Sequence, residues 1–449
     1  MVALLSLAEE FLRHARTHGA DAADVLAVHS TDLNCSMRKG TPETLERSES
    51  TGLGLRVFIG QKGGILSYAN VSTSNLASAN LNTLAESAVA IARAAPPDSF
   101  AGLAPAERLA KTIPNLDLFD AAEPTLEQLQ TQCLEAESAG LAHSGITNSE
   151  GADAGYSAHR MALVTSHGFS GEMRSSYRSL SLSLIAGTGA DMQRDYAYST
   201  ARHNSDLRSA TSIGNEAAER TLARMNPRKI SSSKCPLIFD PRVARSMLSS
   251  LASAINGAAI ARGTSFLKDA MGSQLFSPTI TITDDASRLR GLASRPFDGE
   301  GIATSPLTLI DGGILKTWLL DTRSANQLGM KTTGHASRGL GSAPSPSPTN
   351  LTLHNGTLTP AELMADISEG IYITETFGMG INLITGDYSQ GASGFMIRNG
   401  QRAEAVSEIT IAGHLRSMFS SITAANDLTY ESSINSPTLR IEHMTVAGS

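Results

Sequence analysis

The chain has 449 residues, a length for which two domains of about 200 residues each are the ordinary expectation. Its residues are 41% hydrophobic, 18% charged and 5% aromatic, which is typical of a soluble globular protein and excludes wholesale disorder. The formal net charge is −7, and lysine and arginine form no obvious cluster along the sequence. Both features argue against a nucleic-acid-binding face.

The sequence also indicates where the protein works. No stretch approaches the ~20 apolar residues that a membrane-spanning helix needs, so we expect no membrane partner. Cys35, Cys133 and Cys235 are widely separated and form no CxxC pair, which indicates neither a disulfide framework nor a thiolate metal site. A reducing compartment, the cytoplasm, fits these features best.

We expect the first residues to form an amphipathic helix rather than a signal peptide, because Glu9 and Glu10 interrupt the apolar run. Short β-rich runs between residues 24 and 70 predict a group of antiparallel strands, and a helix is expected from about Ser74 to Ala94. The apolar residues of the first helix recur at helical spacing, at Leu4, Leu5, Ala8, Phe11, Leu12 and Ala15.

A connector rich in proline and alanine, residues 92–115, leads to the next group of elements. Thr125 is a suitable N-cap for an amphipathic helix over residues 125–143. Alternating strands over residues 161–189 and a helix near 213–225 complete the N-terminal half.

The polar, proline-bounded stretch 226–236 predicts a domain boundary. We therefore expect an α+β protein. Residues 1–228 form an N-terminal domain in which helices flank antiparallel strands, with subdomains at about 1–95 and 115–228. Residues 229–449 form a mainly antiparallel β domain with a few helices.

The C-terminal half opens with a helix that carries no titratable side chain between Arg245 and Arg262. Asp240 is a good N-cap, Pro241 suits the first helical position, and Gly263 is the expected stop. The sequence therefore predicts one well-formed helix whose centre has no acid, base or metal ligand.

Beyond this helix the pattern is mostly that of strands. Residues 311–313 (DGG) and 398–401 (RNGQ) have the composition of tight hairpin turns. A short helix is expected at residues 361–369.

The histidines do not form the sequence motifs of a zinc hydrolase. The eleven histidines include no HExxH, HExxxH or HxH, the spacings with which zinc hydrolases present imidazoles and a base. His159 and His167 lie in a strand and turn region, where a structural role is favoured. His335, in the small-residue loop "TTGHASRG", is the more interesting candidate, although a structural role is favoured there too.

Nucleophile and nucleotide motifs are weak as well. No GxSxG elbow is present, and "SSSK" at 231–234 matches SxxK only by letter. Residues 385–394 (TGDYSQGASG) are a candidate anion nest in a loop, but no lysine or threonine completes a nucleotide site. Asp298 and Glu300 in "FDGEG" belong either to a turn or to a site, because acid–base work needs a fixed separation that a sequence does not show.

Several segments, in order along essentially the whole chain, resemble one protein family. They include "GLGLRVFIG", "LIFDPRVARSMLSSLASAINGAAIARGTSFLKDAMG", "TTGHASRG", "TGDYSQGASGFMIRNG" and "PTLRIEHMTVAG". Together they resemble the PmbA/TldE branch of the TldD/PmbA family, once described as modulators of DNA gyrase.

The resemblance implies a pair of subunits with one fold. A TldD-type subunit carries a His-Glu-x-x-x-His zinc helix, and a TldE-type subunit, which this chain is similar to, carries none. Such pairs resemble cytoplasmic metallopeptidases that cleave unfolded or leader-bearing peptides. The resemblance therefore implies a heterodimer with a TldD-type catalytic subunit, with zinc bound by that partner.

The segment "RGTS" (262–265) resembles the tetrapeptide that follows the zinc helix of the catalytic branch. In this register the first zinc ligand, the catalytic base and the second zinc ligand fall on Leu248, Ser249 and Ser253. The catalytic branch also uses a cysteine near its C-terminus, whereas the last cysteine here is Cys235. The resemblance thus implies no catalytic residue, no metal and no cofactor in this chain.

A peptide channel remains the expected role, because an extended peptide can add to a sheet edge through main-chain hydrogen bonds. The alternative is a non-proteolytic peptide-binding or regulatory protein, homodimeric and acting on a partner such as gyrase. The residues expected to line the channel are His335, Asp387, Tyr388, Ser389, Ser393, Asp298 and Glu300.

Overall fold

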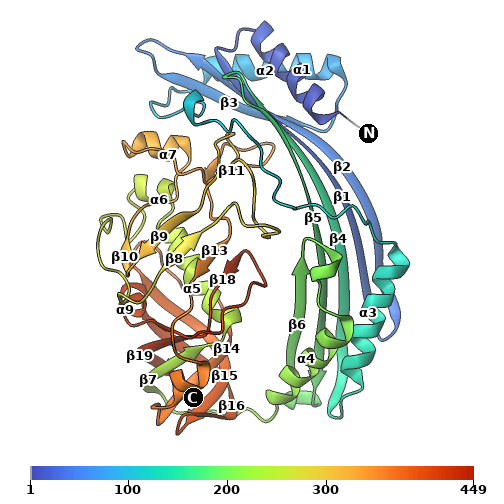
Figure 1. Cartoon of the computed structure of the whole chain (residues 1–449), viewed down its shortest axis with the longest axis vertical. Coiled ribbons are helices and arrows are strands. Elements are labelled where there is room, and N and C mark those ends of the chain that lie inside the picture. The colour runs from blue at the N-terminus through green and yellow to red at the C-terminus, as the bar shows by residue number, and fades with distance from the viewer. Residues whose placement is uncertain (1–2, 449) are drawn as a thin grey trace.

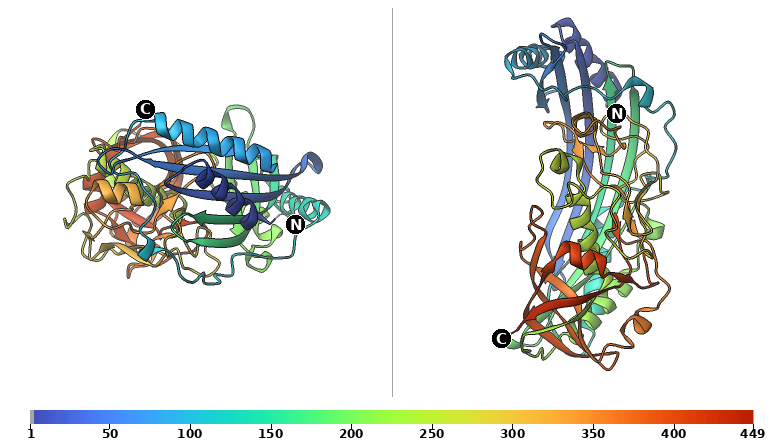
Figure 2. Two further views of the ribbon diagram at one scale, coloured as in Figure 1. Left: turned by 90° about the horizontal axis from the view of Figure 1, so that it is seen from above. Right: turned by 90° about the vertical axis from the view of Figure 1, so that its left-hand side faces the viewer.

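A computed structural model describes residues 3–448 of the chain (Figure 1). A long curved sheet carries helices on its outer face, and a β-rich C-terminal domain lies against its inner face (Figure 1). Two further views show an elongated molecule whose long strands run behind the C-terminal domain (Figure 2). The predicted α+β class is confirmed. Every helix within residues 3–448 is too short or too polar to span a bilayer.

The long sheet is antiparallel throughout and has the order β3-β2-β1-β4-β5-β6. Four of its strands are 17 to 20 residues long, well beyond the usual length of a strand. They can therefore carry two separate helix layers along one face. The strands are β1 (Ala22–Arg38), β2 (Thr41–Gly60), β3 (Leu66–Thr73), β4 (Ile146–Thr165), β5 (Ser170–Ala186) and β6 (Gln193–Ala201).

The outer face of the sheet holds two hydrophobic cores. Because side chains alternate along a strand, Val25 and Ala27 of β1 lie under the first helix pair, and Leu33 and Cys35 lie under the second on the same face. The helices are α1 (Leu4–Thr17) and α2 (Ser78–Ala94) over the first core, and α3 (Leu126–Leu141) and α4 (Ala210–Ala223) over the second.

The expected helices are present. Thr125 caps α3 as predicted, and Gln128 completes a capping box, since each side chain accepts a hydrogen bond from the other residue's backbone N–H. The second helix begins at Ser78, four residues later than predicted, and α4 begins at Ala210, three residues earlier.

The inner face changes character along its length. Leu26 of β1 and Leu163 of β4 pack against Phe297 of the C-terminal domain, near the end of the sheet that α1 and α2 cover, which is the upper end in Figure 1. Farther along, the inner face is polar: Ser30 Oγ lies 2.9 Å from His159 Nδ1, within hydrogen-bonding distance, and Ser157 Oγ donates to Asp32 Oδ1 at 2.6 Å. The upper end therefore packs on the C-terminal domain through apolar side chains, whereas the rest of the inner face presents hydrogen-bonding groups.

The C-terminal domain contains a barrel-like sheet. Its order is β16-β15-β14-β7-β19-β17, and an added β16–β19 pairing closes it; the β7–β14 pair is parallel. Both predicted hairpin turns are confirmed, at 311–313 and 398–401. The strands are β7 (Ser233–Phe239), β14 (Glu369–Phe377), β15 (Asp387–Arg398), β16 (Gln401–His414), β17 (Thr423–Ala424) and β19 (Leu439–Ala447).

A five-stranded sheet, ordered β10-β9-β8-β13-β18, and a β11-β12 pair complete the domain. The expected helix near 361–369 is present but covers only Pro360–Met364. These strands are β8 (Ile282–Asp284), β9 (Leu307–Asp311), β10 (Ile314–Leu315), β11 (Ala336–Ser337), β12 (Ser345–Pro346), β13 (Leu351–Leu353) and β18 (Ile434–Asn435). The helices are α5 (Pro241–Ala254), α6 (Gly257–Ala261), α7 (Thr322–Gln327), α8 (Pro360–Met364) and α9 (Leu415–Ser420).

Candidate functional site

The helix without titratable side chains at its centre is α5. The Asp240 carboxylate accepts a hydrogen bond from the backbone N–H of Arg242 at 3.0 Å, and Pro241 is the first helical residue, as predicted. The prediction of one continuous helix up to Gly263 is wrong, because α5 ends at Ala254 and the short helix α6 follows.

Asn256 accounts for the break between α5 and α6. Its side chain accepts a hydrogen bond from the backbone N–H of Ala258 at 3.0 Å and so caps α6. The next residue, Gly257, donates its N–H to the carbonyl of Leu319, and a Cβ at Gly257 would lie 2.8 Å from that oxygen. The N–H of Gly257 is therefore bonded to the neighbouring segment instead of to the preceding turn of α5. Gly263 ends α6 with a positive φ of 70°.

The three positions implied for ligand, base and ligand do not form a metal site. Leu248 is 2% exposed and belongs to the hydrophobic core, whereas Ser253 is exposed, so the two lie on different faces of α5. Ser249 Oγ donates to the Arg245 carbonyl at 3.2 Å. Within residues 3–448, no three His, Cys, Asp or Glu side chains are grouped to hold a metal ion. The residues present on α5 therefore do not fit zinc, which needs imidazole, thiolate or carboxylate ligands.

His335, Asp298 and Glu300 are brought together near the upper contact between the sheet and the C-terminal domain. One oxygen of Asp298 accepts from the Glu300 N–H at 2.9 Å, and the other accepts from the N–H of Ala336 at 3.1 Å. His335 is 2% exposed, with Nε2 3.3 Å from a carboxylate oxygen of Asp284. These contacts hold the side chains in place and connect them to the surrounding backbone.

Glu300 links this cluster to the long sheet. One carboxyl oxygen accepts hydrogen bonds from the N–H and Oγ1 of Thr322 at 2.9 and 2.7 Å, and the other lies 3.9 Å from Arg56 Nη2 on β2. Burial, followed by repulsion from Asp298, raises the pKa of Glu300 to about 8. Burial also raises the pKa of Asp298, against the opposing effect of Arg295.

The other predicted channel residues lie in strand β15, not in a loop. Asp387 pairs with His414 of β16, and Ser393 pairs with Glu375 of β14, so the anion nest predicted for residues 385–394 is wrong. The glycines here allow close packing: a Cβ at Gly391 would lie 2.1 Å from the ring of Phe377. Residues 387–393 therefore form part of the barrel-like sheet, away from His335.

Their side chains divide between surface and interior. Asp387 and Ser389 are exposed, whereas Tyr388 is 2% exposed in the core. Ser393 is 4% exposed and contacts the N-terminal half, because its Oγ accepts from Arg224 Nη2 at 2.8 Å. Of the predicted channel residues outside β15, Asp298 lines a cavity between the inner face of the sheet and the C-terminal domain, whereas His335 and Glu300 line none of the cavities described below.

Three adjoining cavities follow the contact between the inner face of the long sheet and the C-terminal domain, and we call this row the interdomain seam. The first lies beside Tyr198 and the start of α5, and it shares Ser432 with the second. The second, of about 180 Å³, shares Arg202 with the third, of about 190 Å³. The third lies between β1, β4 and β5 on one side and residues 293–299 on the other.

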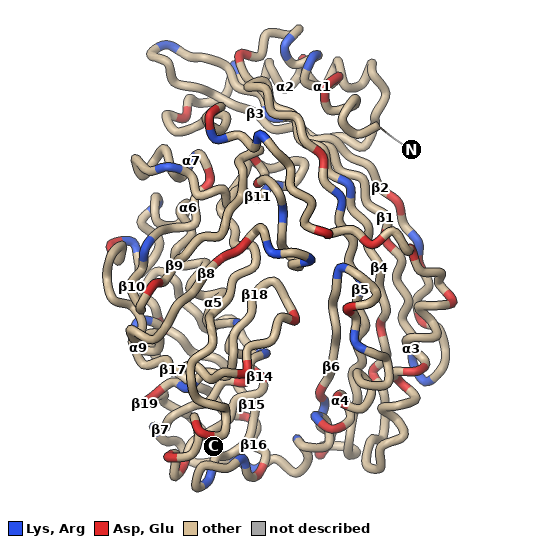
Figure 3. Tube along the Cα trace, in the orientation of Figure 1, with Lys and Arg blue, Asp and Glu red and all other residues tan. Residues whose placement is uncertain are grey.

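The lining of the seam is rich in arginine. Figure 3 shows basic residues where the C-terminal domain approaches the inner face of the sheet. Among the described residues, seven arginines line the three cavities, against the three acids Asp206, Asp298 and Glu431. The arginines are Arg202, Arg242, Arg245, Arg288, Arg290, Arg295 and Arg338.

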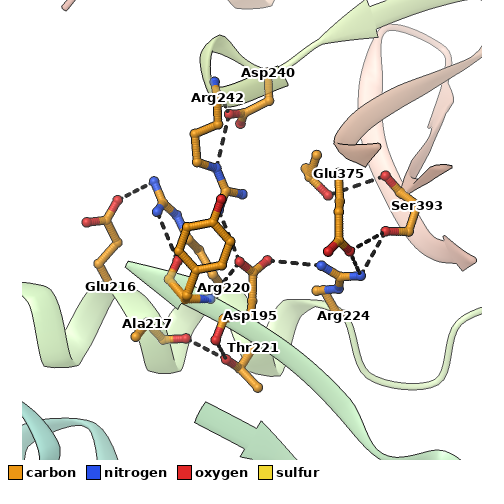
Figure 4. Close-up of polar contacts among 12 residues, drawn as sticks. Asp195, Glu216, Ala217, Arg220, Thr221, Arg224, Asp240, Arg242, Glu375 and Ser393 are labelled. Carbon is orange, nitrogen blue, oxygen red and sulfur yellow. Dashed lines mark hydrogen bonds and ion pairs between the residues drawn. The ribbon is translucent and has the colours of Figure 1, made fainter. Parts of the chain in front are cut away.

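The edge strand β6 borders the seam and is tied to the C-terminal domain by ion pairs (Figure 4). Asp195 of β6 is 4% exposed; its oxygens lie 3.0 Å from Arg242 Nη1 and 3.4 Å from Arg224 Nη1. Arg224 also contacts Glu375 at 2.6 Å. These contacts hold the sheet edge in place next to the cavities.

Sequence reasoning overlooked the arginines. Arg288, Arg290 and Arg295 fall within eight residues, a local signal that could have been noticed. Arg202 and Arg338 come from distant parts of the chain, and only the docking of the C-terminal domain on the sheet places them in one cavity with Arg295.

The fold and the comparisons together define a protein of the metallopeptidase type. Residues 23–92, 119–225 and 232–448 match, in order, domain 1, the central domain and the C-terminal domain of the PmbA/TldA metallopeptidases. The chain belongs to this PmbA/TldD family, which confirms the resemblance drawn from its motifs.

Individual relatives extend over nearly the whole chain. The chain is 37% identical over 433 residues to a metalloprotease PmbA of Escherichia coli O157:H7, covering 96% of this chain and 93% of that protein. It is similar to the structure of a candidate modulator of DNA gyrase from Bacteroides thetaiotaomicron, with TM-score 0.89, 28% identity and coverage of 99% and 98%. Its fold also matches TldE from Thermococcus kodakarensis, with TM-score 0.82, 19% identity and coverage of 98% and 100%.

Proposed function

We propose that this chain is the TldE-type subunit of a heteromeric metallopeptidase. In this assembly a TldD-type partner holds the zinc ion, and this chain contributes part of the substrate channel. The main support for the proposal is the composition of helix α5. It is a well-capped helix in the metallopeptidase C-terminal domain, but it presents serine hydroxyls and a buried leucine where a zinc helix needs imidazoles and a carboxylate.

The substrate in this proposal is an unfolded or leader-bearing peptide. β6 is an edge strand of the long sheet, and Tyr198 and Thr200 of β6 line the seam. An extended peptide placed along such an edge is held by main-chain hydrogen bonds, which require little of its sequence.

We place the assembly in the cytoplasm. The three cysteines are free in the structure, Cys35 and Cys133 are buried, and no pairing stabilises the fold. Such cysteines suit a reducing compartment.

The proposal is tested by reconstitution. The chain, a TldD-type partner and their mixture are incubated separately with an unstructured fluorogenic peptide, with and without a zinc chelator. We expect chelator-sensitive cleavage by the mixture and none by this chain alone. Full activity of the isolated chain would contradict the proposal. Saturable peptide binding without cleavage in any mixture would instead support the non-proteolytic alternative.

A further inference from the structure

Most of the arginines that line the interdomain seam have no ion-pair partner among the described residues. Within residues 3–448, four of the seven have no carboxylate oxygen within 4 Å: Arg202, Arg245, Arg288 and Arg295. This arrangement occurs in a chain whose net charge is −7, so the positive charge is local. A cleft lined by one sign of charge concentrates ligands of the opposite sign.

Three of these four guanidinium groups rest on uncharged partners. Arg202 donates to backbone carbonyls, including that of Leu292 at 2.6 Å. Arg245 donates to the Tyr198 hydroxyl at 2.5 Å, and the guanidinium carbon of Arg288 lies 3.3 Å from the centre of the Tyr430 ring. Such contacts fix the orientation of an arginine but leave its charge uncompensated.

Arg295 differs from the other three because its guanidinium makes no hydrogen bond within the described chain. Its Nε and Nη2 are fully buried and have no acceptor. Arg338, whose side chain is 1% exposed, binds Asp24 through Nη1, but its Nε and Nη2 also lack acceptors. Both arginines line the third cavity. Buried donors are nearly always paired in folded proteins, so the N–H groups of these two arginines are available to an acceptor bound at the cavity.

We propose that the interdomain seam binds a peptide through its carboxylate groups, with one carboxylate held in the third cavity by Arg295 and Arg338. The proposal rests on the proposed function only in taking a peptide as the ligand. Arginine suits a carboxylate because its planar N–H groups can bond both oxygens. The rest of the seam attracts further acidic side chains along the peptide.

The shape and lining of the third cavity favour a peptide over a nucleic acid. The apolar side chains of Leu26, Met161, Met173 and Phe297 line the same cavity as the arginines. A volume of about 190 Å³ accommodates a group the size of one amino-acid side chain. A nucleotide phosphate next to apolar walls would leave its ribose without hydrogen-bonding partners, whereas a residue with an apolar body and a carboxylate satisfies both sides.

The test measures binding by the full chain alone, by fluorescence anisotropy, so neither zinc nor a partner is needed. Three labelled peptides of equal length are compared: one with internal glutamates and an amidated end, one with glutamines and an amidated end, and one with glutamines and a free C-terminal carboxylate. We expect at least one carboxylate peptide to bind about tenfold tighter than the amidated glutamine peptide. The two carboxylate peptides show whether a side chain or the chain end is recognised.

Two variants test whether Arg295 and Arg288 contribute to binding of the carboxylate. Arg295→Met removes the unpaired guanidinium while keeping an unbranched apolar side chain, and Arg288→Met removes a seam arginine that stacks on Tyr430. We expect both to reduce the preference for carboxylate peptides, Arg295→Met the more strongly. The control is Arg262→Met, an exposed arginine at the end of α6. Circular dichroism checks that each variant is folded.

Equal binding of all three peptides would overturn the inference, as would an unchanged carboxylate preference in folded Arg295→Met and Arg288→Met. Displacement of the best peptide by a short single-stranded oligonucleotide at lower concentration than by unlabelled peptide would also overturn it. A missing carboxylate preference together with cleavage by the reconstituted mixture would remove this inference and leave the proposed function intact.

Discussion

Asp195 on the edge strand β6 lies 3.0 Å from Nη1 of Arg242 in the first turn of α5, and this ion pair joins the two halves of the molecule beside the interdomain seam. Both side chains are largely buried, with exposed fractions of 4% and 9%. The pair therefore fixes the position of the sheet edge relative to α5.

Asp195→Asn should destabilise the protein strongly. The substitution removes the carboxylate that Arg242 and Arg224 share, while Asp240 and Glu375 remain beside them. We therefore expect a loss of about 3 kcal/mol, the lower end of the cost of breaking a buried pair. Asp311→Asn is the control, because Asp311 is 63% exposed and its pair with Lys316 is worth less than ~1 kcal/mol. Chemical unfolding of both variants measures the difference. Similar small losses would show that the junction is not important for stability.

Stability should fall as the pH rises from about 5 to 8, through Glu300. The folded pKa of Glu300 is about 8, against 4.5 for the unperturbed carboxyl. Between these values the folded chain holds a proton that the unfolded chain has released, so increasing pH favours unfolding.

Glu300→Gln should flatten this part of the pH profile, because glutamine does not titrate and can still accept hydrogen bonds from Thr322. Glu404→Gln is the matched control, since contact with Arg398 lowers the pKa of Glu404 and places its titration below this window. Thermal unfolding from pH 5 to 8 gives both profiles. A Glu300→Gln profile parallel to that of the unmodified chain would refute the assignment.

Gly54→Ala should loosen the docking of the C-terminal domain on the sheet. A Cβ at Gly54 would lie 2.0 Å from the carbonyl oxygen of Leu340, a backbone atom that cannot rotate away. We expect a loss of about 1–3 kcal/mol from this overpacking. Gly102→Ala is the control, because the nearest atom to its added Cβ is 4.0 Å away. Equal melting temperatures for the two variants would argue against a close contact at Gly54.

Ser249→Ala and Ser253→Ala should leave the activity of the reconstituted mixture within about twofold of the unmodified value. Neither hydroxyl is expected to take part in the reaction. Removing a group that acts in the transition state would lower the rate much more than twofold. Steady-state kinetics of the two mixtures provide the readout. A hundredfold loss in either would assign a catalytic role to α5 of this chain.

Local patterns predicted the elements that local forces determine. The spacing of Leu4, Ala8 and Phe11 predicted α1, and Thr125 marked the start of α3, because helix faces and caps depend on residues close in sequence. The break at Asn256 was not predictable in this way. It depends on the approach of Leu319, more than sixty residues later in the chain.

The candidate site was harder to predict from the sequence, because its residues are brought together by tertiary structure. The glycines of residues 385–394 suggested a loop, but they serve close packing within a strand, as Gly391 shows under the ring of Phe377. The sequence did place His335 and Asp298 among the residues of interest, and the structure brings them together. The arginine seam forms only when the two halves of the chain meet.

The most direct test of the central claim is the zinc content of the purified chain, measured by inductively coupled plasma mass spectrometry alone and after co-purification with a TldD-type partner. We predict zinc in the co-purified assembly and only traces in the isolated chain. Zinc bound stoichiometrically by the isolated chain would contradict it, because α5 offers no ligand set that could hold the metal.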